Sequence, residues 1–295
     1  MLRSALLVSL VLVFAACGSE DVSRDADGQL QLGREEAREV TERSVGLGDR
    51  TLVLDVDAGS ITVVGTDDDE ARLRFVCVAR GATQASAQQR LDKLTIEEAG
   101  DEEIYQYVAR ANDLESIRVN VEVLVPRAAS LNLKIERGGI RLSGATGPIR
   151  AEAENGSVEA AGLAGRQVIL RTELGNVNAG FAALYADAEA EIETDNGNVV
   201  VTLPPDASVA LDVEAGTGNV SVQGLTFADE SLDESGTGTA FEGRLGTGAA
   251  ELRARTSVGN IELRGGRSLV LEDLAGGVTD STAVPPGAPV PPSPD

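Results

Sequence analysis

Apolar and polar residues alternate along most of this chain, and a short tripeptide interrupts the alternation at intervals. The tripeptide is Gly, then Gly, Ser or Asn, then Val or Ile, and its glycines are Gly59, Gly138, Gly156, Gly175, Gly197, Gly218 and Gly259. A strand repeats its side-chain direction every two residues, so the distance from the glycine fixes the face of each residue. The pattern therefore predicts pairs of strands joined at glycines, each with one solvated face.

The positions expected to face inward carry apolar residues or threonine. Five and three residues before the glycines stand Leu54, Val56, Leu133, Ile135, Ala151, Ala153, Leu170, Thr172, Ile192, Thr194, Val213, Ala215, Ala254 and Thr256. Two and four residues after them stand Ile61, Val63, Ile140, Leu142, Val158, Ala160, Val177, Ala179, Val199, Val201, Val220, Val222, Ile261 and Leu263. The same phase places Ile169, which precedes Leu170, on the outer face.

The spacing of the glycines indicates how the strand pairs are arranged. From Gly138 to Gly218 the intervals are 18, 19, 22 and 21 residues, and the 41 residues up to Gly259 are about two periods. Periods near twenty residues are typical of a β-solenoid or β-helix. Consecutive hairpins of a β-sandwich give similar turn intervals, so the sandwich is the alternative.

Charges four residues before the glycines favour stacking of successive repeats. The series Lys134, Glu152, Arg171, Glu193 alternates in sign, and opposite charges on neighbouring strands attract. Glu214 and Arg255 neither extend nor break the series, because a loop-like stretch at 231–238 lies between them.

The part of the chain before the regular repeats has a different sequence pattern, which predicts a helix as well as strands. We expect a strand through Cys77, a helix over 83–94, and strands over 104–110 and 117–126. Ala87, Leu91 and Leu94 fall on one helical face, and Ser86 with Gln89 is suited to a capping box. The helix is expected to cover an end or edge of the sheet, which open-ended stacks need.

The N-terminus reads as a secretory signal. Residues 1–16 hold one basic residue and a short apolar run, and Cys17 follows two alanines. This ending resembles the bacterial lipobox, which implies that Cys17 becomes the lipidated first residue and that residues 17–37 form a flexible tether. Gly18, rather than Asp, favours the outer membrane by resemblance to Gram-negative sorting, and a Gram-positive surface lipoprotein is the alternative. Cleavage near Ala16 by an ordinary signal peptidase would instead leave Cys17 a free thiol.

Residues 38–275 form the expected β domain. Within it, 38–127 is the strand–helix part and 128–275 contains the repeats. The proline-rich residues 276–295 are expected to be disordered.

The amino-acid composition narrows the classes of function open to this protein. The net charge of −23 opposes binding to nucleic acid. The chain has no histidine, which excludes histidine-based nucleophile systems and metal sites. Cys77 lies in phase with core residues and is expected to be buried.

Carboxylates are the remaining candidates for chemistry. Two residues before the glycines runs a column of acids, Asp57, Glu136, Glu154, Glu173 and Asp195. Two carboxylates suffice for glycoside hydrolysis. These acids, however, recur at the same position of each repeat, without the local irregularity of an active site, so we expect them to form a solvated edge. The acidic run at 67–70 lacks calcium-loop spacing and is expected to be a strand-connecting turn. We therefore assign no catalytic, cofactor or metal residue.

The lipobox, the strand–helix unit and the repeats ending in RARTSVGNIELRG resemble the bacterial putative-adhesin domain family, over roughly 38–274. The resemblance implies a surface-exposed envelope protein with β-solenoid character and no catalytic residues to carry over. We expect an adhesin-like interaction or structural module, tethered to the membrane by lipid, whose partner is an envelope protein or glycan. The alternative is a carboxylate-dependent polysaccharide-processing β-helix enzyme.

Overall fold

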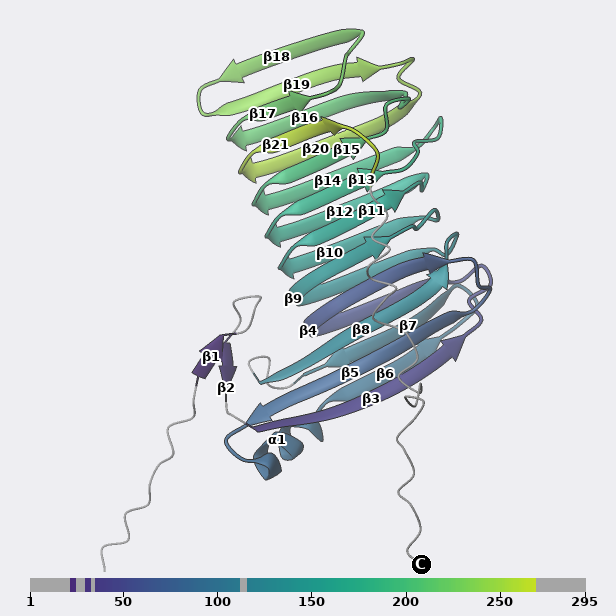
Figure 1. Ribbon diagram of the computed structural model, residues 1–295, viewed down its shortest axis with the longest axis vertical. Helices are drawn as coiled ribbons and strands as arrows, with labels where there is room; N and C mark the ends of the chain where they lie inside the picture. Colours follow the sequence, from purple (N-terminus) through teal and green to yellow (C-terminus); the bar gives the residue numbers. More distant parts are fainter. Residues whose placement is uncertain (1–21, 25–29, 33–34, 112–115, 269–295) are drawn as a thin grey trace, which may run out of the picture.

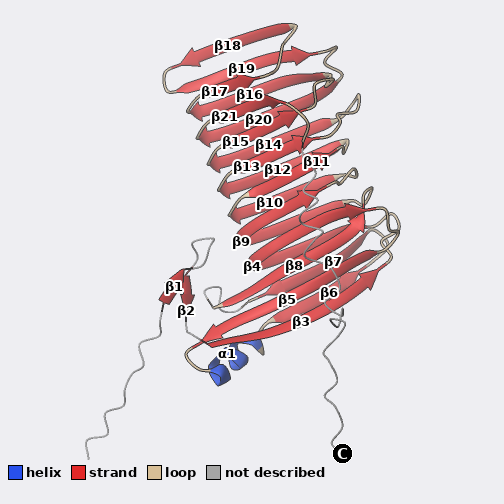
Figure 2. Cartoon of the chain, in the orientation of Figure 1, coloured by secondary structure: helices blue, strands red, loops and turns tan. Residues whose placement is uncertain are grey.

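The computed structural model describes residues 22–24, 30–32, 35–111 and 116–268. In this part of the chain nearly every element is a strand, and there is one short helix (Figures 1 and 2). The expected all-β class with one helix near the N-terminus is confirmed.

The strands stack into two layers that enclose the core (Figure 1). In the first layer, hydrogen-bonded neighbours follow in the order β6 (Thr95–Gly100), β7 (Ile104–Arg110), the first half of β4 (Thr51–Thr66), the first half of β9 (Leu131–Ser143), β10 (Ile149–Asn155), β12 (Gln167–Leu174), β14 (Glu189–Asn196), β20 (Ala250–Val258), β16 (Val209–Thr217), β19 (Gly238–Leu245) and β18 (Asp229–Ser235).

In the second layer the order is β3 (Glu35–Val45), β5 (Ala71–Gly81), β8 (Ile117–Pro126), the second halves of β4 and β9, β11 (Val158–Leu163), β13 (Val177–Phe181), β15 (Val199–Leu203), β21 (Ile261–Gly265) and β17 (Val220–Gln223). The long strands β4 and β9 run through Gly59 and Gly138 and belong to both layers. From β4 to β16 and β17 all neighbours within a layer run parallel.

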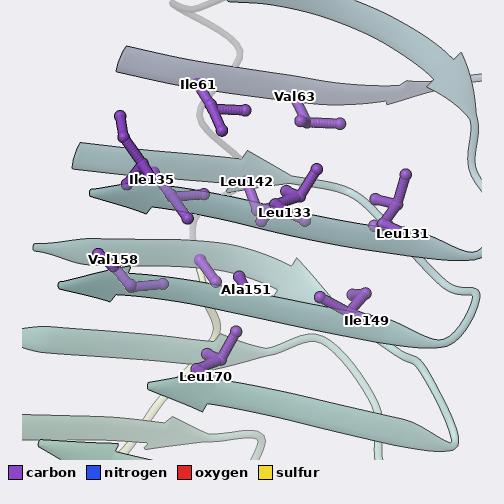
Figure 3. Close-up of a cluster of buried hydrophobic side chains, with 14 of the residues drawn as sticks. Ile61, Val63, Leu131, Leu133, Ile135, Leu142, Ile149, Ala151, Val158 and Leu170 are labelled. Atoms are coloured by element: carbon purple, nitrogen blue, oxygen red, sulfur yellow. The ribbon is translucent and has the colours of Figure 1, made fainter. Parts of the chain in front are cut away.

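The core lies between the two layers and has the predicted phase. Leu133, Ala151 and Leu170 stack in register and are fully buried (Figure 3). Every other position expected to face inward is also buried, apart from two in the last strand of the second layer. Val220 there is half-buried and Val222 is exposed, because β17 ends its layer and has a neighbour on one side only.

The repeated glycine is required by the spacing of the stack. Gly138 has φ of 132°, and a Cβ on it would lie 1.8 Å from the carbonyl oxygen of Gly59 in the neighbouring repeat. The corresponding distance from Gly175 to the oxygen of Gly156 is 2.1 Å. A side chain at these positions would force the repeats apart, so glycine is the residue that fits.

Side chains next to the glycines tie neighbouring repeats together. Asn176 Oδ1 accepts a hydrogen bond from the backbone N–H of Asn198 at 2.8 Å, and Asn198 Oδ1 accepts one from Asn260 at 2.9 Å. Inside, threonine hydroxyls donate to glycine carbonyl oxygens one repeat away, in the pairs Thr172 with Gly156, Thr194 with Gly175 and Thr256 with Gly197. The threonine bonds satisfy buried polar groups, and both sets of bonds fix the register.

The repeats do not stack in chain order. Strands β20 and β21 come last in the sequence, yet β20 lies between β14 and β16, and β21 lies between β15 and β17. The expectation that successive repeats stack on one another is therefore correct up to β14 and β15, and wrong beyond them. The chain passes to the far end of the stack and then returns to fill the gap.

The N-terminal end of the stack carries the helix. Helix α1 (Gln84–Leu91) is shorter than the expected 83–94 and packs on β5 and β3, with Ala87 and Leu91 buried (Figure 1). Its capping box joins Thr83 and Ser86, not Ser86 and Gln89, because Thr83 is the N-cap residue. Strands β5, β7 and β8 occupy the expected segments, whereas β6 was not expected.

The opposite, distal end is closed by a hairpin. The expected loop-like stretch at 231–238 is wrong, because β18 and β19 pair antiparallel across a turn at Gly236 and Thr237. The acidic and serine residues of β18 have low strand propensity, so the sequence analysis did not predict a strand there. The 41-residue interval from Gly218 to Gly259 thus contains this hairpin.

The expected tether partly overlaps described strands. β1 (Val22–Arg24) and β2 (Leu30–Leu32) pair antiparallel, and β3 begins at Glu35, before the expected boundary at Arg38. Cys17, the signal segment 1–16 and the tail 276–295 lie outside the described residues. Within the described part of the chain, no helix is long and apolar enough to span a bilayer.

Candidate interaction surface

A column of alternating charges runs up the outer face of the first layer. Four residues before each glycine, the spatial order of the repeats is Asp55, Lys134, Glu152, Arg171, Glu193, Arg255 and Glu214, each in register with the next. The sign changes at every step. In chain order the alternation covers only the five residues from Asp55 to Glu193, and the insertion of β20 extends it over all the repeats.

The two arginines of β20 lie between two acidic strands. Arg255 is in register with Glu193 of β14 and Glu214 of β16, and its guanidinium is 3.9 Å from the Glu214 carboxylate. Arg253 lies beside Asp212 of β16 at 4.0 Å, and Arg255 reaches the same carboxylate at 3.3 Å. If β16 paired directly with β14, Glu214 would lie beside Glu193, and like charges on neighbouring strands repel each other. The arginines therefore favour the observed strand order.

The acidic column two residues before the glycines is a solvated and partly paired surface. Asp57 accepts hydrogen bonds from Arg110 at 2.7 Å and from the N–H of Ala111 at 2.8 Å, and Glu154 lies 3.5 Å from the Lys134 ammonium. A shallow hollow of about 320 Å³ on this face is lined by Lys134, Glu152, Ala153, Glu154, Arg171, Thr172, Glu173, Glu193 and Asp195. No group of residues in the described ranges has the arrangement of a metal site.

The acidic run at 67–70 is the strand-connecting turn expected from the sequence. It joins β4 to β5, and Asp68 pairs with Arg72 at 2.6 Å while Asp67 pairs with Arg127 at 2.9 Å. Two of its four carboxylates are thus engaged by arginines.

A small cavity lies at the N-terminal end, between β3, β5, α1, β6 and β7. Its volume is about 180 Å³, and Phe75, Cys77, Leu91 and Tyr107 are among its lining residues. Burial raises the pKa of the Cys77 thiol to about 11, with a smaller contribution from Glu39, and burial also raises the pKa of Tyr107. Both groups are therefore neutral at pH 7, and the expectation of a buried core cysteine is confirmed.

The distal end presents an open sheet edge. The first layer extends beyond the second by β19 and β18, so no strand of the second layer faces them (Figure 1). Phe241 of β19 is buried and contacts Phe227, but Leu232 of β18 is 56% exposed. The free edge of β18 has backbone groups with no strand beside them in the described chain.

Strand β18 is also acidic on both of its faces. Asp229 pairs with Arg244 of β19, whereas Glu230, Asp233 and Glu234 are exposed and have no ion pair within the described residues. The sequence analysis missed this edge. The signal available was the alternation of DESLDES, in which one apolar residue sits among acids and serines.

Comparisons with known proteins give structural likenesses only. No family model matches the sequence, and no curated protein matches it. A putative cell adhesion protein from Clostridium sporogenes aligns with 79% of this chain and 100% of its own, at 14% identity and a TM-score of 0.46. A putative adhesin from Bacteroides fragilis aligns with 77% and 97%, at 9% identity and a TM-score of 0.34. A putative lipid binding protein from Parabacteroides distasonis covers 77% and 97%, at 7% identity and a TM-score of 0.26. The chain is thus similar to solved bacterial proteins named as adhesins, at TM-scores below 0.5.

Proposed function

We propose that this protein is a lipid-anchored β-solenoid that acts outside the cytoplasm as an adhesin-like interaction or structural module of the bacterial envelope. Cys17 carries the lipid, and the outer membrane is the favoured location in a Gram-negative cell. The protein catalyses no reaction and needs no cofactor. Its partner is an envelope protein or glycan.

The solenoid assignment is supported by the direction of the strands. Each repeat contributes one strand to each layer, and neighbours within a layer run parallel. Consecutive hairpins in one sheet of a sandwich would pair antiparallel.

The observation that carries the functional proposal is the separation of the two ends of the stack. The first layer places β6 at the N-terminal end and β18 at the other, with ten strand spacings between them. At about 4.8 Å each, these spacings hold the distal edge roughly 48 Å from β6. A lipid on the N-terminal side would therefore leave the distal edge facing away from the membrane.

The regularity of the acidic face supports a surface without catalysis. Glycosidases need one carboxylic acid held protonated beside a second carboxylate, commonly by burial. Glu154 has a side chain that is 40% exposed and pairs with Lys134, and Glu173 is exposed. Both carboxylates are accessible to solvent.

Two experiments test this proposal. A photo-reactive residue at Ser231, at the distal edge, should yield a defined adduct in intact cells, and the same residue at Glu173 should not. Equal labelling at both positions, or none at Ser231, would contradict a distal interaction surface. The purified protein should release no product from a panel of envelope polysaccharides. Product release that is lost in Glu154→Gln or Glu173→Gln would show instead that the protein is a polysaccharide-processing enzyme.

A further inference from the structure

The stack already contains a basic strand that lies between two acidic strands, and the open edge of β18 is acidic as well. Strands β14 and β16 both carry carboxylates on their outer faces, and both take the arginine-bearing β20 as their neighbour. Between β14 and β16, two acidic strands are thus joined by a strand of opposite charge. Strand β18 has β19 on one side and no strand on the other in the described chain.

We propose that the free edge of β18 binds an extended, lysine- or arginine-rich segment of a partner protein, which adds to the first layer as a further strand. The proposal rests on the proposed function and names the chemistry of the partner. Strand addition to an open edge supplies backbone hydrogen bonds, and the side chains on the two faces of the edge set specificity.

Both faces of β18 fit such a segment. Asp233 is in register with Ala240 and lies on the outer face, while Glu234 and Glu230 lie on the inner face with Leu232. Leu232 is exposed because no second-layer strand faces it, so an apolar residue of the added strand could cover it. A segment with basic residues on both faces and one central apolar residue matches this arrangement.

The same charges argue against a second copy of this chain as the occupant. Two β18 strands side by side would bring Asp233 and Glu234 close to carboxylates of the same kind, and charged edges oppose such pairing. The edge strands at the other end, β3 and β6, are acidic on balance: β3 has Glu35, Glu36, Glu39 and Glu42 against Arg38 and Arg43, and β6 has Glu97 and Glu98. Electrostatic complementarity therefore selects a basic partner.

The test uses the full protein and a blocked seven-residue peptide, KKTVKKT, with a fluorescent label. We expect saturable binding at 0.15 M salt, and new amide exchange protection confined to β18 and β19. The double variant Asp233→Lys, Glu234→Lys should weaken binding at least tenfold. The control Glu173→Lys, Asp195→Lys makes the same charge change on strands that have neighbours on both sides, and it should change the affinity less than twofold. Unchanged melting temperatures of both variants verify their folding.

A second peptide separates strand addition from general attraction to an acidic protein. It has the same side chains, but every internal backbone amide is N-methylated so that neither edge of the peptide can donate hydrogen bonds. Equal binding of the methylated peptide, or equal loss of binding in both double variants, would overturn the proposal. Self-association of the protein that disappears in Asp233→Lys, Glu234→Lys would also overturn it, in favour of a second copy. If the peptide does not bind but the residue at Ser231 gives a defined adduct in cells, the proposed function stands and only the basic-strand partner is excluded.

Discussion

Reversing the two arginines of β20 tests why the last repeat inserts between β14 and β16. In the variant Arg253→Glu, Arg255→Glu, the new glutamates would face Glu191 and Glu193 on one side and Asp212 and Glu214 on the other. Each of these four opposite-charge pairs in register contributes about 0.2–1 kcal/mol, and like charges in the same positions cost a similar amount. The arginine side chains are 57% and 51% exposed, so the lower part of the range applies. We expect the variant to lose about 2–4 kcal/mol of unfolding free energy.

The measurement is equilibrium urea unfolding at low and high salt. The matched control is Arg264→Glu in β21, because the register neighbours of Arg264 are the uncharged Thr202 and Gln223. The control loses only its solvent-exposed pair with Glu262 and should destabilise the protein much less than the double variant. At 1 M salt the screening length is about 3 Å, so the difference between the variants should shrink. A loss in the double variant that equals the control, or that does not change with salt, would refute the role of charge in strand order.

Three further outcomes are expected. Cys17→Ala should abolish lipid labelling and move the protein to the soluble fraction; unchanged membrane association of this variant would remove the lipoprotein assignment. The raised pKa of Cys77 means that the folded state keeps a proton that the unfolded chain releases near pH 9.0, so stability should fall as pH rises from about 9 to about 11. Cys77→Ala should flatten that alkaline slope in urea titrations, and an unchanged slope would contradict the assignment. Gly175→Ala should destabilise by more than about 2 kcal/mol, because its Cβ would lie 2.1 Å from a carbonyl oxygen, whereas Gly46→Ala meets open space and should melt like the wild type.

The face of nearly every repeat residue could be predicted from the sequence because the period of a strand is two and the glycine fixes the phase. Leu170 and Ile169 are both large aliphatics, yet the first is fully buried and the second half-buried beside Arg150 and Glu191, as the phase requires. The prediction succeeded where local rules, namely the strand period and the glycine turn, decide the structure.

The order of the repeats could not be predicted in this way. The glycine phase is the same for β16 and β20, so it does not specify which of them pairs with β14. The deciding signal was in the charges, because Arg255 complements Glu193 and Glu214 does not. The sequence analysis kept the repeats in chain order, and the alternation therefore ended at Glu193. Charge complementarity between strands is a tertiary property, which only a comparison of alternative orders would have revealed.

The distal edge was missed for a related reason. Strand β18 is held by its pairing with β19, and its own residues have low strand propensity and little burial. The candidate interaction surface therefore lies where the local signal is weakest. By contrast, the acidic column was found from the sequence because it follows the glycine phase.

Comparison of Leu170→Asp with Ile169→Asp by thermal and urea unfolding tests the stacked-strand register most directly. Leu170 lies between Ala151 and Ile192 in the core, so an aspartate there would be buried without a partner and should cost on the order of 4 kcal/mol or more. At position 169 the carboxylate reaches solvent, and the cost should stay within about 1 kcal/mol. The account predicts that Leu170→Asp unfolds the stack or lowers its midpoint strongly while Ile169→Asp remains close to the wild type. Equal destabilisation, or the reverse order, would contradict the register on which the whole architecture depends.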